Sequence, residues 1–141
     1  MRKITTDRSI QKNARSSVHK YFKKMQVKQQ PLSALKPHAD NPRTHSPKQI
    51  RQIADCICQF GFTNPVLVDS DGRVIAGHGR IEAAKLLGMD SVPAICLDQM
   101  TEAQKRAYII ADNKLAANAG WDPELLAREL QCIWELDSDL P

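Results

Sequence analysis

Two periodicities alternate along the chain, and each predicts one type of element. Apolar residues recur at helical spacing after Pro47 and again after Pro123, which predicts helices with one buried face. Short β-rich runs lie at 32–35, 65–68, 73–76 and 91–98. With further helices at 80–87 and 102–119, the expected order is β-α-β-β-α-β-α-α. This order is typical of a compact α/β (α+β) domain with a small mixed sheet flanked by helices.

Capping residues mark where three of these helices begin. Ser46 with Gln49, and Thr101 with Gln104, have the spacing of capping boxes. Asp122 precedes a proline, which is favoured in a first helical turn. A glycine follows each of the first three helices, where it readily ends a helix.

The same pattern predicts buried helix faces, a hairpin and the state of the cysteines. We expect burial of Ile50, Ile53, Ile57 and Phe60 in the first helix and of Leu126, Leu130, Ile133 and Trp134 in the last. The tetrapeptide "DSDG" predicts a hairpin, with Gly72 at positive φ. No Cys-x-x-Cys pair is present, so we expect reduced, mostly buried thiols at Cys56, Cys58, Cys96 and Cys132.

Charge divides the chain into a basic arm, residues 1–30, and a body, residues 31–141. The arm has nine basic side chains and one acidic one, a net charge of +8, whereas the body has eleven basic and fifteen acidic ones, a net charge of −4. A basic arm on an acidic body is a common arrangement for contacting nucleic acid. Apolar residues from Ile10 to Met25 predict that the arm is helical. It either docks that apolar face on the body or a second subunit, or contacts DNA, or is a disordered tail.

No run of apolar residues approaches the ~20 residues of a membrane span. The N-terminus also lacks the apolar stretch of a secretory signal. We therefore expect a cytoplasmic protein with no membrane partner, associated with the nucleoid if it binds DNA.

The segment "VIAGHGRIEAAKLLG" places a Gly-His-Gly-Arg turn between a strand and a helix. Gly77 and Gly79 permit unusual backbone torsions and close approach of another group. The start of the helix offers unpaired N–H groups and a favourable dipole for an anion. Arg80 adds a planar cation suited to phosphate, and His78 can donate or accept. These features predict a phosphate site, although glycines at such junctions also occur for steric reasons alone.

Two other groups of polar residues have weaker interpretations. His38, Asp40 and His45 lie close in one loop, but no regular spacing fixes them, so we interpret them as surface residues without a metal. Asp69 and Asp71 could serve a nuclease, which needs clustered carboxylates around a metal ion. Their position in a tight hairpin explains them equally well.

Three segments resemble a known family. These are "LKPHADNPRTHSPKQI", "FGFTNPVLVDSDGRVIAGHGRIEAAKLLGMDSVPAICLD" and "MTEAQKRAYIIADNKLAANAGWDPELLARELQ". Together they resemble the N-terminal domain of ParB-like proteins, which have the ParB/sulfiredoxin fold, and most of all the prokaryotic versions found beside or fused to DNA methyltransferases. The resemblance implies a nucleotide-binding domain at 31–141, with CTP and Mg²⁺ as in partition proteins or ATP as in sulfiredoxins. Other members of the fold are nucleases or small-molecule kinases.

The resemblance also assigns the glycine turn. The partition family's Gly-Glu-Arg-Arg phosphate motif falls on Gly77, His78, Gly79 and Arg80. His78 stands where sulfiredoxins have their reactive cysteine, which excludes sulfinic-acid repair. Gly79 removes one of the two arginines of the partition motif.

Further site residues follow from the same resemblance. The family's Asn-Pro-Arg box falls on 41–43, so Arg43 is expected to close the phosphate site from the loop. Its Glu-Asn pair falls on Asp112 and Asn113, with Lys114 adjacent. Asp112 is then the expected Mg²⁺ ligand, with Asn113 and Lys114 near the phosphates.

Three classes of function remain open. The preferred one is a nucleotide-binding module (CTP or ATP with Mg²⁺) that acts in DNA metabolism, such as chromosome partitioning, as a DNA-associated or regulatory domain. Its expected partners are DNA, bound without sequence preference through residues 1–30, and a DNA methyltransferase or a second copy. The second class is an enzyme, either an NTP-dependent kinase or ATPase or a DNA nuclease. The third is a protein-interaction module that binds no nucleotide.

Overall fold

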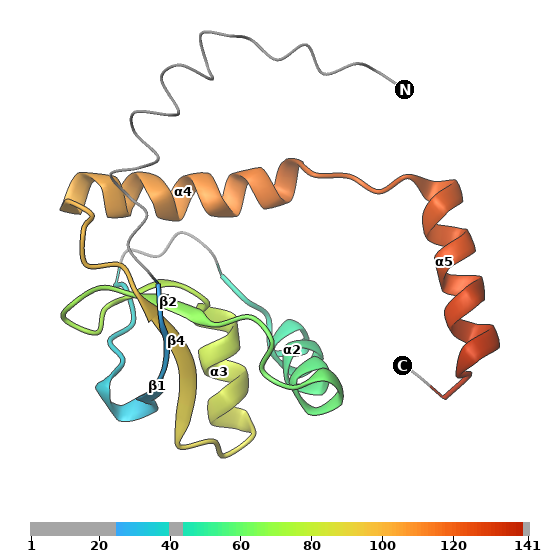
Figure 1. The fold of residues 1–141 in the computed structure, drawn as a ribbon, viewed down its shortest axis with the longest axis horizontal. Helices are drawn as coiled ribbons and strands as arrows, with labels where there is room; N and C mark the ends of the chain where they lie inside the picture. The colour runs from blue at the N-terminus through green and yellow to red at the C-terminus, as the bar shows by residue number, and fades with distance from the viewer. Residues whose placement is uncertain (1–24, 40–43, 140–141) are drawn as a thin grey trace, which may run out of the picture. The chain divides into compact units, whose positions relative to one another are not determined.

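The computed structural model describes residues 25–39 and 44–139. The chain divides into two compact units. The first contains residues up to His38 together with His45–Asp98, and the second contains Ala39–Thr44 with Gln99–Pro141. Among the described residues, the first unit carries the sheet and two α-helices, and the second carries two further α-helices (Figure 1). Each unit is described by itself below.

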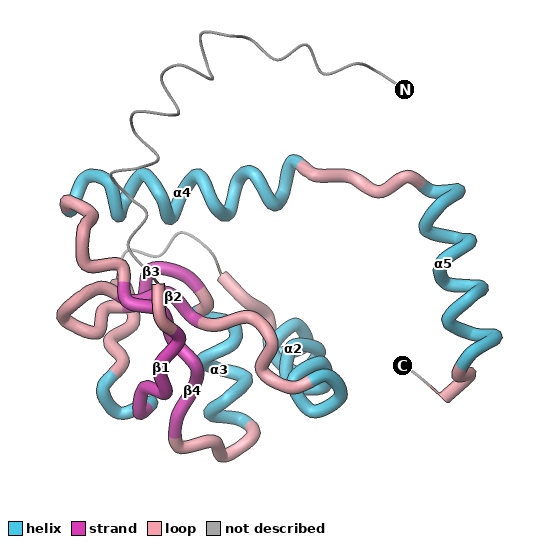
Figure 2. The backbone as a smooth tube through the Cα atoms, viewed as in Figure 1, coloured by secondary structure: helices cyan, strands magenta, loops and turns pink. Residues whose placement is uncertain are grey.

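A four-stranded mixed sheet forms the first unit, as the pattern predicts. Its strands are β1 (Val27–Pro31), β2 (Val66–Val68), β3 (Val74–Ala76) and β4 (Ser91–Cys96), arranged in the order β1-β4-β2-β3. β4 pairs antiparallel with β1 and parallel with β2, while β2 pairs antiparallel with β3. The strands are drawn in magenta in Figure 2.

The first strand differs from the prediction. The strand covers Val27–Pro31. Residues 32–35, where a strand is predicted, begin instead with a 3-10 helix, Leu32–Ala34. β1 is an edge strand with four of its five residues exposed, so no alternation of apolar and polar residues marks it in the sequence. β1 includes residue 30, which the charge distribution predicts as the end of the basic arm. Residues 1–24, including most of the predicted arm helix, lie outside the described residues.

The β2–β3 hairpin is confirmed. Gly72 has φ of 77°, and a Cβ there would lie 2.6 Å from the carbonyl oxygen of Ala34. Oδ1 of Asp69 accepts hydrogen bonds from the backbone N–H groups of Asp71 and Arg73, both at 2.9 Å. The Asp69 side chain is therefore buried as part of the turn.

Helix α2 (Pro47–Phe60) begins at the predicted cap. The Ser46 hydroxyl accepts from the Gln49 N–H at 3.2 Å, and Gly61 ends the helix with φ of 81°. The side chain of Gln49 contacts His45 instead of closing the capping box. Ala54 is the fully buried residue of α2, whereas Phe60 is 62% exposed, so its predicted burial is wrong.

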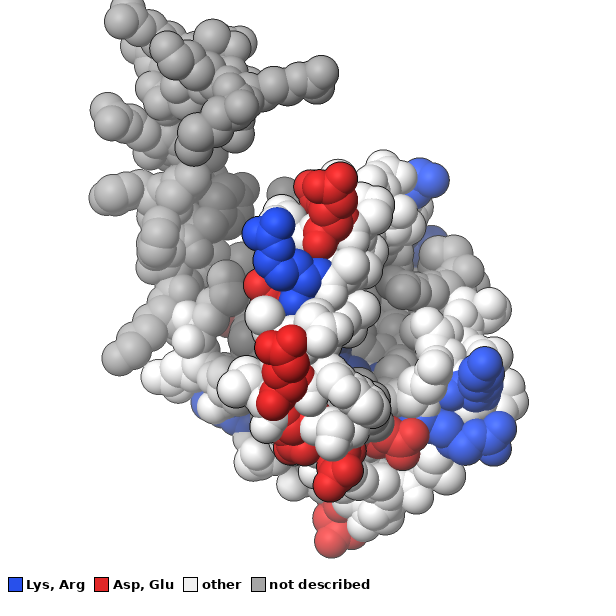
Figure 3. All heavy atoms as spheres, turned by 90° about the vertical axis from the view of Figure 1, so that its right-hand side faces the viewer, with Lys and Arg blue, Asp and Glu red and all other residues white. Residues whose placement is uncertain are grey.

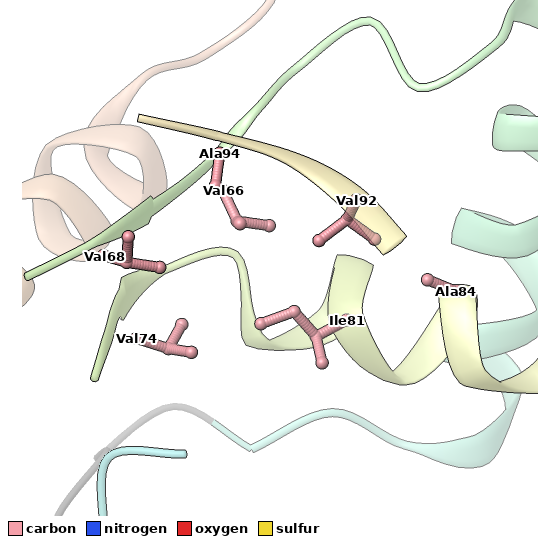
Figure 4. Close-up of a cluster of buried hydrophobic side chains, with 7 residues drawn as sticks. All are labelled: Val66, Val68, Val74, Ile81, Ala84, Val92 and Ala94. Atoms are coloured by element: carbon pink, nitrogen blue, oxygen red, sulfur yellow. The ribbon is translucent and has the colours of Figure 1, made fainter. Parts of the chain in front are cut away.

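Helix α3 (His78–Leu86) packs between α2 and the sheet (Figure 1). Two of its buried residues, Ile81 and Ala84, join residues of three strands in one apolar cluster (Figure 4). The cluster consists of Val66, Val68, Val74, Ile81, Ala84, Val92 and Ala94. Most of these side chains are small, which allows the helix to lie close to the sheet.

The second unit contains α4 (Glu102–Asn118) and α5 (Pro123–Leu136). The Thr101–Gln104 capping box forms with both of its hydrogen bonds. Asp122 caps α5 by accepting from the N–H groups of Glu124 and Leu125, at 3.0 Å and 3.1 Å. Both starts confirm the prediction.

The predicted burial of the α5 apolar face is wrong. No residue of α5 is buried, and Leu130, Ile133 and Trp134 are 57%, 43% and 64% exposed. The predicted burial of the thiols is also wrong, because all four cysteines are free and exposed. Among the described residues, no helix combines the length and apolar character needed to cross a bilayer.

Candidate functional site

The first turn of α3 starts two residues earlier than predicted. Gly77 is the N-cap residue, with φ of 103° and ψ of 21°, and its carbonyl accepts from the N–H of Ile81 at 3.0 Å. His78, Gly79 and Arg80 therefore form the first helical turn. The N–H groups of a first turn have no partner within the helix, so these three amides can face an anion.

Gly77 is required both by its backbone torsions and by its surroundings. A Cβ at this position would lie 2.8 Å from Cγ1 of Val66 and 2.9 Å from Nη2 of Arg80. Other residues rarely adopt its positive φ. The unusual backbone torsion predicted for this glycine is confirmed, and the groups that lie close to it include the arginine of the motif.

Gly79 is needed for close packing and does not adopt an unusual backbone torsion, so the torsion predicted for it is wrong. It lies inside α3 and is buried. A Cβ there would lie 2.9 Å from Cδ1 of Ile53 and 3.1 Å from two ring atoms of His45. The absence of a side chain at 79 lets α2 and the residue before its cap approach α3.

Arg80 connects the helix start to the sheet. Its Nη2 donates to the carbonyl oxygen of Pro65 at 3.2 Å, next to the start of β2. The side chain is half-buried and folds back over Gly77. The bond to Pro65 holds a planar cation beside the amides of the first turn. This arrangement suits an oxyanion.

His78 is a neutral partner in this site near pH 7. Its Nε2 lies 3.3 Å from the N–H of His38, which donates to it. Burial lowers the pKa of His78 below its ordinary value of 6.5, and the neighbouring His38 and His45 lower that pKa further, while Glu82 raises it. With Nε2 accepting, the neutral ring carries its proton on Nδ1. His78 can therefore donate one hydrogen bond but does not supply a fixed positive charge.

The structure brings two residues to this site that the sequence interpretation left in a surface loop. His38 reaches His78 through its backbone N–H, and His45 packs on Gly79. No local sequence pattern marks these histidines as site residues, because their approach to α3 depends on how α2 packs against α3. Within 25–39 and 44–139, no group of three His, Cys, Asp or Glu side chains could hold a metal ion.

The other predicted site residues belong to the second unit or are not described. Asp112, Asn113 and Lys114 are on α4 in the second unit, where Asp112 and Lys114 are exposed. Nδ2 of Asn113 donates to the Ile109 carbonyl at 2.8 Å. The role of Asp112 as a Mg²⁺ ligand stays a prediction. Arg43 lies outside the described residues.

Comparison with known proteins places these motifs in one family. The sequence pattern of the ParB N-terminal domain matches residues 16–113. The ParB-like nuclease domain-containing protein YnaK of Escherichia coli is 52% identical over 83 residues, covering 59% of this chain and 95% of YnaK. The stage 0 sporulation protein J of Bacillus subtilis is 30% identical over 86 residues, covering 58% of this chain and 30% of that protein. The chain thus spans less than a third of that longer relative.

Solved structures confirm the fold. The truncated partition protein ParB of Caulobacter crescentus, complexed with CTP-γ-S, has a TM-score of 0.68 at 20% identity, covering 82% of this chain and 66% of that one. Sulfiredoxin of Arabidopsis thaliana has a TM-score of 0.50 at 22% identity, covering 60% of this chain and 97% of the sulfiredoxin. At such identities the likeness shows the ParB/sulfiredoxin fold alone. Together with the sequence match, it shows that this chain belongs to the ParB N-terminal domain family.

Proposed function

We propose that this chain is a nucleotide-binding ParB-like domain that acts in DNA metabolism as a DNA-associated or regulatory module. The observation that carries the proposal is the first turn of α3, where the Arg80 guanidinium lies over Gly77 beside three helix-start amides. A partition protein of the same fold has been solved with CTP-γ-S, which supports a nucleoside triphosphate as the ligand.

In this proposal residues 78–80, in the first turn of α3, bind phosphate oxygens. The amides of 78–80 and the guanidinium of Arg80 donate hydrogen bonds, and the neutral ring of His78 donates through Nδ1. CTP or ATP is the expected nucleotide, with Mg²⁺ held by Asp112 and by the phosphates themselves. Arg43, Asn113 and Lys114 are proposed as further phosphate contacts on the strength of the family motifs.

Thermal melts with CTP, ATP and GTP, each with Mg²⁺, test the site. A triphosphate at about 100 times its dissociation constant should stabilise the fold by about 2.7 kcal/mol. Arg80→Ala should remove most of this gain. Arg51→Ala, which changes an exposed arginine on α2, should keep it. If no triphosphate changes the melting temperature, the proposed site is wrong.

The magnesium assignment has its own test. Asp112→Asn should weaken nucleotide binding in Mg²⁺ but not in EDTA, because the carboxylate is proposed to bind the ion. Calorimetric titrations under both conditions compare the two. An equal loss in both would assign Asp112 to a role that does not involve the metal.

DNA contact is proposed for the basic N-terminal arm. On the face shown in Figure 3, acidic and basic side chains of the described residues are interspersed and do not form one basic patch. Because β1 begins at Val27, a truncation that keeps the sheet should remove only residues 1–24, which hold eight of the arm's nine basic side chains. That deletion should abolish most DNA affinity and flatten its salt dependence, whose log–log slope is about −0.9 per phosphate contact. If the arm instead docks on the body or on a second copy, deletion will lower the melting temperature or dissociate an oligomer.

A nuclease is the second candidate, because a relative that is 52% identical is named for a ParB-like nuclease domain. Asp69 argues against the hairpin as the catalytic centre, because its carboxylate is occupied by the turn. Incubation of supercoiled plasmid with Mg²⁺ or Mn²⁺, with and without nucleotide, separates the candidates. Cleavage that survives Arg80→Ala would place the chemistry away from α3.

A further inference from the structure

His45 occupies the space that a side chain at residue 79 would fill. Its Cε1 and Nε2 atoms lie 3.1 Å from the position of a Cβ on Gly79. It comes directly before Ser46, the cap of α2, so the start of one helix presents this ring to the start of another. The ring is half-buried.

The hydrogen bond on the other side of the ring fixes its orientation. Nδ1 of His45 lies 3.2 Å from Oε1 of Gln49, one turn into α2. An amide oxygen can only accept, so the neutral tautomer that makes this bond carries its proton on Nδ1 and leaves Nε2 as an acceptor. Nε2 is the ring nitrogen beside Gly79. A proton added there would give the His45 ring a second donor, beside the first turn of α3.

Four other titratable or charged groups belong to this site. His38 and His78 are the neighbouring imidazoles, Arg80 follows on the same turn of α3, and Glu82 is the acidic group that acts on His78. A phosphate at the first turn of α3 supplies the negative charge to which a protonated Nε2 can donate.

We propose that His45 is a further phosphate-binding residue of this site, and that its Nε2 takes up a proton from solvent as phosphate binds and donates it in a hydrogen bond. The inference rests on the proposed function, since it concerns the same site. It makes nucleotide affinity depend on pH through one identified ring. Affinity should increase as the pH falls through the range in which histidine changes charge.

The experiment is calorimetric titration of CTP and ATP, each with Mg²⁺, between pH 8 and pH 5.5. The dissociation constant of the unaltered protein should fall with pH, with a limiting slope of about tenfold per pH unit for one proton taken up. Titration in two buffers of different ionisation enthalpy should show proton uptake on binding. His45→Gln keeps a polar side chain of similar reach but cannot be protonated, so its pH slope and proton uptake should be lost.

His38→Gln is the matched control. It changes a second imidazole of the cluster but keeps the backbone N–H that bonds to His78. This variant should keep the pH slope. Titration of the nucleotide's own phosphates contributes equally to all three proteins, so their differences report on the protein.

NMR titration of the histidine Cε1–H signals provides a readout that needs no folded variant. The midpoint of the His45 signal should move to higher pH when nucleotide is added to the unaltered protein. A His45→Gln protein that keeps the wild-type slope, or a His45 midpoint that does not move, overturns the inference while the triphosphate site at Arg80 stands. If the unaltered protein binds no triphosphate, the proposed function fails and the inference fails with it.

Discussion

Helices α3 and α5 differ in how much of their surface the protein covers. α3 has nine residues and buries four of them, Gly79, Ile81, Ala83 and Ala84. α5 has fourteen residues, is strongly amphipathic, and buries none. α3 packs between α2 and the sheet, so its sequence needs small residues more than it needs one apolar stripe.

The difference shows what an apolar stripe can and cannot predict. The stripe on α5 correctly predicts the helix and its apolar side. It does not predict that the same unit supplies a surface to cover that side. Exposed apolar faces of this kind often mark sites where proteins associate. α3 is the reverse case, in which burial follows from close approach of neighbours.

The largest expected effect is a charge placed in α3. Ala84 is 0% exposed, so Ala84→Glu would bury an unpaired carboxylate and overpack the core. It should lower the free energy of unfolding by at least about 3 kcal/mol, whereas Leu130→Glu on α5, at a position 57% exposed, should change it by no more than about 0.5 kcal/mol. Urea denaturation of both variants measures this. Similar losses would mean that α5 is buried in solution.

Glycine substitutions at the two ends of α3 should give the next largest effect. Gly77 and Gly88 both have positive φ, but only Gly77 has neighbours within 4 Å of a Cβ. Gly77→Ala should cost about 2–3 kcal/mol, from backbone strain and overpacking together, and Gly88→Ala about 1 kcal/mol, from strain alone. Chemical denaturation compares the two. Equal costs would show that Val66 and Arg80 move aside freely.

Sequence predicts the local features of this fold well. Helix starts at Ser46, Thr101 and Asp122, and the turn at Gly72, depend on neighbours within a few residues, and all form at the expected residues. The capping box predicted for Ser46 and Gln49 is the exception, because Gln49 contacts His45. The predicted position of the edge strand β1 is wrong, because mostly exposed residues form it and its partners on β4 lie sixty or more residues away.

The candidate site is predictable in the same uneven way. Gly77 and Arg80 belong to one short motif, and the structure keeps them in contact. The packing role of Gly79 and the position of His45 depend on how α2 meets α3, which no local pattern reveals. The residues assigned by resemblance on α4 and in 41–43 stay predictions.

Acid should destabilise the first unit modestly through His78. Its pKa in the folded protein is lowered, mainly by burial, so the unfolded chain binds the proton first as the pH falls. The contribution to stability is complete above the ordinary value of 6.5 and is lost as the pH falls from there through the lowered pKa. Because the ring is only half-buried, the effect should stay below about 1 kcal/mol. Denaturation between pH 7.5 and 5 should show a shallower decline for His78→Gln, and an unchanged decline would place the titrating group elsewhere.

The smallest effect on global stability should come from the cap of α5. A helix of about 12–15 residues without tertiary contacts is marginal in water, so the ends of α5 decide how much of it forms. Asp122→Ala removes two hydrogen bonds to the first turn and should cost α5 about 1 kcal/mol. Because no residue of α5 is buried, this loss should reduce helical circular dichroism and speed amide exchange in 123–136, with no shift in the main melting transition.

Ser46→Ala is the matched control for this last comparison, because Ser46 caps α2, a helix that packs on α3. There the same chemical change should lower the main transition, since α2 cannot unwind without exposing its contacts with α3. If Asp122→Ala lowers the main transition as much as Ser46→Ala, then α5 is covered in solution. Sedimentation velocity over a range of concentrations would then test a second copy of the chain as the cover, because such a transition should also depend on protein concentration.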